Sequence, residues 1–156
     1  MQFGRYFEEF TIGQVIHHSQ TKTIFESDNN LFSLLTMNHH PVHLDAEYAK
    51  KQQHGQILVV GTLVFSLAVG LTVIDISGKA IANLDYENIL HHKPVFINDT
   101  IHAKTTVLDV RKSSTKNDRG VIYVLTEVFN QHEDLVLSFK RHVLIKSNAL
   151  IENEER

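Results

Sequence analysis

The longest apolar stretch of the chain runs from Ile57 to Ile76, and the residues from Ile57 to Ile74 carry no charge. A membrane-spanning helix needs about 20 mostly apolar residues, so length alone allows a bilayer span. The flanks of the run carry no basic cluster, and no second apolar span follows. We therefore predict a helix that is apolar all round and buried in the core of a soluble domain. Gly61 and Gly70 mark positions where another backbone or a ligand can approach it closely.

The first third of the chain predicts one short strand and one helix. Residues 15–24 are rich in threonine and predict a strand. The apolar residues of the segment 31–35 fall on one helical face, and Ser27 or Asp28 can cap the helix that carries them. This helix must end before Pro41, because proline disfavours helical geometry in the residue that precedes it.

After residue 78 the apolar positions recur every second residue, which predicts strands with one face exposed to water. The alternation is clear in the segments 101–108 and 135–145, where the polar face of the second segment carries Ser138, Lys140 and His142. Polar turns at 116–120 and 130–134 predict consecutive hairpins. Pro94 predicts a kink or an edge in the strand that begins near Ala80.

Together these patterns predict an α+β fold in which an antiparallel sheet of about five strands curls over one long helix. With 156 residues, 42% of them hydrophobic, the chain predicts a single domain over 1–146, followed by a polar tail over 147–156. A net charge of −3 gives no electrostatic reason to expect a nucleic-acid partner. The lack of cysteine and of a signal-peptide pattern at the start leads us to expect a cytoplasmic protein.

The residues that could carry out chemistry are concentrated in the segment 38–45. Its last residue, Asp45, can cap a short helix that follows. Pro41 stiffens this segment, as a loop that holds a catalytic imidazole requires. As a neutral imidazole His43 can take a proton from water near pH 7, and Asn38 can orient that water. Most of the other ten histidines are interpreted as surface or hydrogen-bonded core residues, among them His17, His18, His91, His92, His132 and His142.

Four motifs in order resemble the MaoC-like dehydratases, the (R)-type enoyl-CoA hydratases with a hot-dog fold. They are Gly4-Arg5-Tyr6-Phe7-Glu8-Glu9-Phe10 with Gly13, Asn38-x-x-Pro41-Val42-His43-x-Asp45, Val59-Val60-Gly61, and Pro94-Val95-Phe96-x-x-Asp99-Thr100. The resemblance implies an antiparallel sheet wrapped around one long helix. It also implies an acyl-CoA substrate with no further cofactor, and a homodimer or higher homo-oligomer. From charge and the flanks of the apolar run we expect no nucleic-acid or membrane partner.

The family's hydratase motif, Asp-x-Asn-Pro-Leu-His, places its histidine at His43 and its aspartate at Asn38. An amide cannot act as a base, so either His43 performs all the proton transfer or another carboxylate contributes, and Asp45 is the nearest in sequence. Hydration of an enoyl thioester also needs a donor for the carbonyl oxygen, which gains charge in the transition state. The resemblance implies that the backbone N–H of Gly61 supplies it.

The long aromatic lead and Asn38 are similar to a branch of the family that acts on branched C5 dicarboxylic thioesters such as itaconyl-, mesaconyl- or methylmalyl-CoA. A free carboxylate on the substrate calls for a cationic partner, and the candidates are Arg5, His39 and His40. With Asp45 these form the expected substrate-binding set.

Two other classes of protein fit the same residues. The first is a hot-dog acyl-CoA thioesterase, which would release free CoA thiol. The second is a non-catalytic module that binds acyl-CoA or a metal. His40, His43 and Asp45 could nominally hold a divalent ion, but Pro41 lies between the two histidines and their spacing is not that of helical zinc ligands, so we expect no metal.

Overall fold

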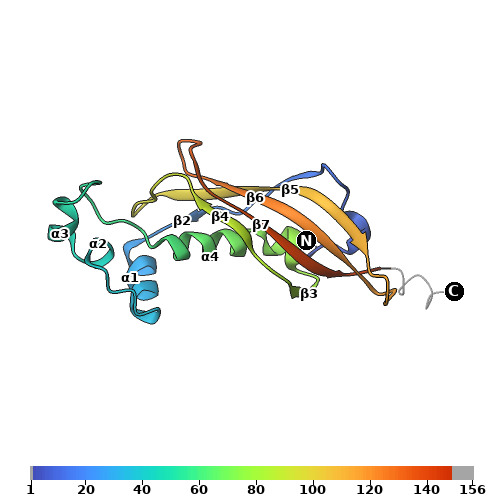
Figure 1. Ribbon diagram of the computed structural model, residues 1–156. Coiled ribbons are helices and arrows are strands. Elements are labelled where there is room, and N and C mark those ends of the chain that lie inside the picture. The colour runs from blue at the N-terminus through green and yellow to red at the C-terminus, as the bar shows by residue number, and fades with distance from the viewer. Residues whose placement is uncertain (1, 149–156) are drawn as a thin grey trace.

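The computed structural model describes residues 2–148, and its long strands curl over one central helix (Figure 1). A group of three short helices projects beyond the sheet near the start of the central helix (Figure 1). The helical elements are η1 (Phe7–Glu9), α1 (Glu26–Leu35), α2 (Pro41–Leu44), α3 (Ala46–Lys50), α4 (Gly61–Thr72) and the π-helix η2 (Val73–Ser77). The predicted α+β architecture is confirmed.

The sheet contains seven strands in the described part of the chain, where the sequence predicted about five. They are β1 (Val15–His17), β2 (Lys22–Thr23), β3 (Ala80–Asn83), β4 (Glu87–His91), β5 (Thr100–Lys112), β6 (Arg119–Phe129) and β7 (Leu135–Lys146). Their order is β1-β5-β6-β7-β3, with β2 also on β5 and β4 also on β7. Each edge of the sheet is thus formed by two short strands. The gap between β3 and β4 falls at residues 84–86, before the interruption predicted at Pro94.

The hairpins β5–β6 and β6–β7 form as predicted, and all their pairings are antiparallel. Burial alternates along β5 from Thr100 to Val107, so one face of the strand packs on the core. In β7 the alternation is interrupted, because Ser138 is buried although the pattern placed it on the wet face. Arg141 on the same strand is only 1% exposed, which the pattern did not predict.

The apolar run does not form one helix from its first residue. Its first residues are extended, since Leu58 forms a β-bridge with Phe96 and the Val59 N–H donates to Val95 O at 2.9 Å. The helix begins at Gly61 and continues through η2. Within residues 2–148, no helix has the length and apolar character required to cross a bilayer.

The projecting helices α1–α3 follow the predicted order with two corrections. The α1 helix begins at Glu26, and Asp28 acts as the third helical residue, where its carboxylate accepts from the Phe25 N–H at 2.8 Å. The segment expected to be a stiff loop contains the single helical turn α2, which starts at Pro41. The cap of α3 is as predicted, because Asp45 Oδ1 accepts from the Tyr48 N–H at 2.9 Å.

Two packed clusters fill the space between sheet and helix. One cluster surrounds α4 and includes Ile24, Val60 and Phe139. The other joins η1 to the far end of the sheet and includes Phe7 and Ile76. At the C-terminal end, Ser147 and Asn148 donate to the Glu8 carboxylate. The rest of the predicted tail, 149–156, lies outside the described residues.

Candidate active site

His43 lies in the single turn α2, and its ring is fixed by the start of the apolar run. Its Nδ1 lies 2.7 Å from Leu58 O, and the Leu58 N–H donates to Val42 O at 3.1 Å. A carbonyl oxygen only accepts, so Nδ1 carries the hydrogen and Nε2 of the neutral ring keeps its lone pair. His43 is therefore held in the tautomer that a general base requires.

A buried side chain that the sequence did not single out connects three elements at this point. Asn29 of α1 is 1% exposed. Its Nδ2 donates to His43 O at 3.1 Å, and its Oδ1 accepts from the Val60 N–H at 2.9 Å. Asn29 thus links α1, the turn α2 and the residue before α4. No local signal in the sequence marked Asn29, because residues 26–30 are all polar.

His43 lines a cavity of about 530 Å³ between α1, the apolar run and the turn before β5. The cavity is also lined by Glu26, Asn29, Asn30, Leu44, Gln56, Ile57, Ile97 and Asn98. Glu26 is a carboxylate that shares this cavity with the imidazole, and sequence reasoning did not consider it. Asn38 is not among the lining residues.

Gly61 lines a second cavity of about 260 Å³, which shares no lining residue with the cavity of His43. It is the first residue of α4, where N–H groups have no partner inside the helix and the helix dipole favours negative charge. Leu58, whose carbonyl holds the His43 ring, precedes Gly61 by three residues, and such a segment spans at most about 11 Å. The residue whose carbonyl holds the imidazole is therefore within about 11 Å of the helix start.

The other residues predicted in the loop have local structural roles. The His40 side chain caps α2, because its Nδ1 accepts from the Val42 N–H at 3.2 Å. The carboxylate of Asp45 caps α3. His39 is exposed, and Asn38 is half-buried with its N–H donating to Ser33 O at 3.0 Å. Direct contacts of these four residues with substrate remain predictions.

Arg5 lies at the opposite end of the central helix from the cavity of His43. The Gly4 N–H donates to Ile74 O at 2.8 Å, and Ile74 follows Gly61 by 13 helical residues, a distance of about 20 Å. Within one chain, Arg5 is therefore too far from Gly61 to bind the carboxylate of a short acyl group whose carbonyl rests there.

A buried polar network lies near the end of α4, and in it His18 is a hydrogen-bonded core histidine, one of the two roles predicted for it, while its partners were not predicted. His18 Nδ1 lies 2.8 Å from Asp75 Oδ2, and its Nε2 lies 2.8 Å from Thr105 Oγ1. Burial lowers the pKa of His18, and the hydrogen bond to Asp75 opposes that shift. Arg141 donates to Thr72 Oγ1 at 2.8 Å, and burial lowers its pKa as well. These groups were scattered in the sequence and meet only in the fold.

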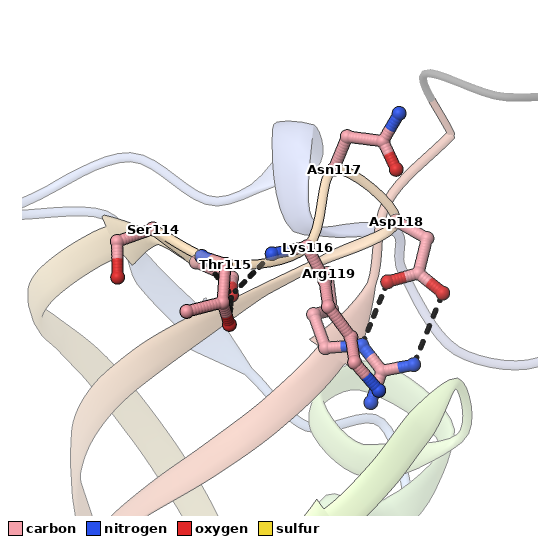
Figure 2. Close-up of a pocket in the computed structure, with 7 residues that line it drawn as sticks. Ser114, Thr115, Lys116, Asn117, Asp118 and Arg119 are labelled. Carbon is pink, nitrogen blue, oxygen red and sulfur yellow. Dashed lines mark hydrogen bonds and ion pairs between the residues drawn. The ribbon is translucent and has the colours of Figure 1, made fainter.

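Two surface features lie away from His43. Asp85, Glu87 and His142 are grouped closely enough to hold a metal ion, but His142 Nδ1 already bonds Asp85 and the Tyr123 hydroxyl donates to Glu87 at 2.7 Å. The β5–β6 turn lines a hollow of about 650 Å³. Figure 2 shows the residues of this turn. The Arg119 guanidinium there is paired with Asp118 through two hydrogen bonds (Figure 2).

Comparison with known proteins identifies the family of the chain. The MaoC like domain model matches residues 7–128. The chain belongs to the MaoC-like domain family. It is 34% identical over 143 residues to the mesaconyl-CoA hydratase of Cereibacter sphaeroides and 32% identical to the β-methylmalyl-CoA dehydratase of Chloroflexus aurantiacus. These alignments cover 92% of this chain but 41% and 40% of the relatives, so the MaoC-like chain spans about two-fifths of their length.

The solved structures confirm the predicted hot-dog fold. A Mycobacterium tuberculosis protein described as a double hot-dog fold superposes with a TM-score of 0.85 and 23% identity. The match covers 93% of this MaoC-like chain and 45% of that protein.

Proposed function

We propose that this MaoC-like protein adds water across, or removes it to form, the α,β double bond of an enoyl-CoA thioester with a short, branched dicarboxylic acyl group. The hydratase and dehydratase names of the two relatives support the reaction and the acyl class. The observation that carries the proposal is the hydrogen bond from His43 Nδ1 to Leu58 O, which leaves Nε2 as a base beside a cavity.

In the proposed reaction the thioester lies across residues 56–59, with its carbonyl oxygen at the Gly61 N–H. His43 Nε2 removes a proton from water as the oxygen attacks C3, and the enolate charge is stabilised at the start of α4. The same imidazolium then returns the proton to C2. Atoms balance, because one water is added and no cofactor is consumed. Asn38 is proposed to orient the water, and Glu26, which lines the same cavity as His43, is proposed as an assisting carboxylate.

We also propose that the protein is a homodimer. The strands β3 and β4 pair only with β7 among the described strands, so their other edge has no partner. Large apolar side chains are exposed along it, namely Ile81, Leu84, Tyr86, Ile89 and Leu90. An open apolar edge of this kind is normally covered by another chain.

The cysteine-free sequence and the proposed CoA thioester substrate both fit a reducing cytoplasm.

The experiment follows two signals on a panel of enoyl-CoA thioesters. Loss of the conjugated double bond without free thiol, fastest on mesaconyl- or itaconyl-CoA, is the expected result. Release of thiol in step with thioester loss would establish the thioesterase alternative. Binding of the thioesters without any turnover would leave the non-catalytic acyl-CoA module.

A further inference from the structure

His91, the last residue of β4, lies directly against the start of the central helix. A Cβ added to Gly61 would lie 2.9 Å from Cε1 and 3.1 Å from Nε2 of the His91 ring. The imidazole therefore packs on the residue whose N–H is proposed to hold the thioester carbonyl. No sequence motif indicated this contact, because the two residues are 30 positions apart and belong to different elements.

The cavity that His91 and Gly61 share is basic. Its lining includes His54, His91, His92 and Lys93, and no acidic residue is among its lining residues. Most of these basic groups already have a neighbour. Lys93 Nζ pairs with Asp134 at 2.7 Å, His92 Nε2 lies 2.8 Å from Ser138 Oγ, and the His54 ring packs edge-on against Phe96.

The ring nitrogens of His91 take part in no hydrogen bond that the structure shows within residues 2–148. An imidazole that faces a cavity can donate to an anion, and the bond is stronger when the ring is protonated. An anion bound by His91 would lie close to Gly61, because the His91 ring occupies the space that a side chain at position 61 would need. In a C5 enedioyl thioester the free carboxylate is attached at or next to the double bond. It therefore lies close to the thioester carbonyl, as His91 lies close to Gly61.

We propose that His91 is a specificity residue that binds the free carboxylate of the acyl group while Gly61 holds the thioester carbonyl. This inference rests on the proposed function for the placement of the carbonyl. His91 is exposed, as the sequence predicted, and the proposal gives this surface position a role in binding. It also supplies a hydrogen-bond donor for the carboxylate close to Gly61, where Arg5 lies too far away within one chain.

The test measures equilibrium binding of unreactive ligands, so it does not depend on turnover. Wild type and His91→Phe are titrated calorimetrically with methylsuccinyl-CoA, butyryl-CoA and free CoA at one pH and ionic strength. Phenylalanine keeps a planar ring over Gly61. The Kd for methylsuccinyl-CoA should rise about 10- to 100-fold, as expected for a lost charge-assisted hydrogen bond, and the other two should change less than about threefold.

Two further variants keep the result interpretable. His91→Gln retains an N–H donor and should lose less affinity for methylsuccinyl-CoA than His91→Phe does. His17→Phe makes the same change at an exposed position of β1 and should bind all three ligands as wild type does. Circular dichroism on each variant shows that the fold is retained.

Each other outcome has a defined meaning. An equal loss for all three ligands would show that His91 binds the CoA phosphates or supports the cavity, and it would overturn the proposal. Unchanged affinity for methylsuccinyl-CoA would overturn it too. If the diacid preference is present in wild type and lost in His91→Phe but no enoyl-CoA is hydrated, the carboxylate site stands and the proposed hydratase function fails.

Discussion

At the scale of single residues, we propose different tasks for the two nitrogens of His43. Nδ1 is bonded to Leu58 O, and this bond leaves Nε2 for proton transfer. His43→Ala removes the base, so kcat should fall about 10²- to 10⁴-fold, the range for a general acid–base group. The measurement is turnover of mesaconyl-CoA, with circular dichroism as the folding control. A folded variant with wild-type turnover would contradict the assignment.

Asn38 and Asn29 are two amides whose roles should separate by experiment. Asn38→Ala should reduce kcat about ten- to several-hundred-fold if its amide orients the water, with little change in stability. Asn29 is buried and bonded on both sides, so Asn29→Ala should lower the free energy of unfolding by about 1–3 kcal/mol and reduce turnover as well. Urea titration and steady-state kinetics give both quantities. Wild-type kinetics for Asn38→Ala would remove that residue from the water site.

Gly61 was marked in the sequence as a place of close approach, and the structure shows what approaches it. A methyl group at this position would force the His91 ring to move, which is feasible because the contact is with the end of a side chain. Gly61→Ala should therefore fold, yet raise KM or lower kcat at least about tenfold by narrowing the site where the carbonyl rests. Unaltered kinetics on all thioesters would show that Gly61 serves packing alone.

At the scale of elements, the π-helix η2 carries Asp75 against a buried histidine. Burial lowers the pKa of His18 in the folded protein. Below about pH 6.5 the unfolded chain therefore binds a proton at this histidine more readily than the folded protein does. Stability should therefore decrease as pH falls from about 7.5 to 5.5, while the neutral ring supports the fold at higher pH. The charged groups that act on the ring are Asp75, Arg141 and His17.

This pH effect is measured by urea unfolding of wild type and His18→Gln across the same range. Glutamine does not titrate, so the variant should lose less stability on acidification than wild type does. Other histidines contribute equally to both proteins and cancel in the comparison. Parallel pH profiles for the two proteins would show that His18 does not titrate with a lowered pKa in the fold.

The elements also show what the sequence could predict and what it could not. The alternation in β5 and the cap at Asp45 are local signals, and the structure matches them, whereas the alternation in β7 is interrupted at the buried Ser138. The first residues of the apolar run were predicted as helix because their side chains are uniformly apolar. Only pairing with the segment around Val95, which is distant in sequence, keeps them extended. Asn29, Glu26 and His91 gave no such local signal, since each acquires its role from neighbours brought by the fold.

At the scale of the whole molecule, the exposed edge formed by β3 and β4 should be the dimer contact. Leu84 is 53% exposed in this edge, so Leu84→Lys should convert the dimer to a monomer by placing a charge in the interface. Ile12→Lys changes an exposed residue near β1 and should leave the mass unchanged. Light scattering after gel filtration decides between the outcomes. A monomeric wild type would contradict the proposed assembly.

We propose that the protein adds water across a double bond, or removes it, with His43 as the base. In the most direct test, mesaconyl-CoA is incubated with wild type and with His43→Ala in water labelled with a heavy oxygen isotope. The products are identified by mass spectrometry. Wild type should form a hydroxyacyl-CoA that is heavier by one labelled water, and His43→Ala should form it about 10²- to 10⁴-fold more slowly. Labelled free acid together with free CoA would contradict the claim, because water would then have attacked the thioester carbonyl.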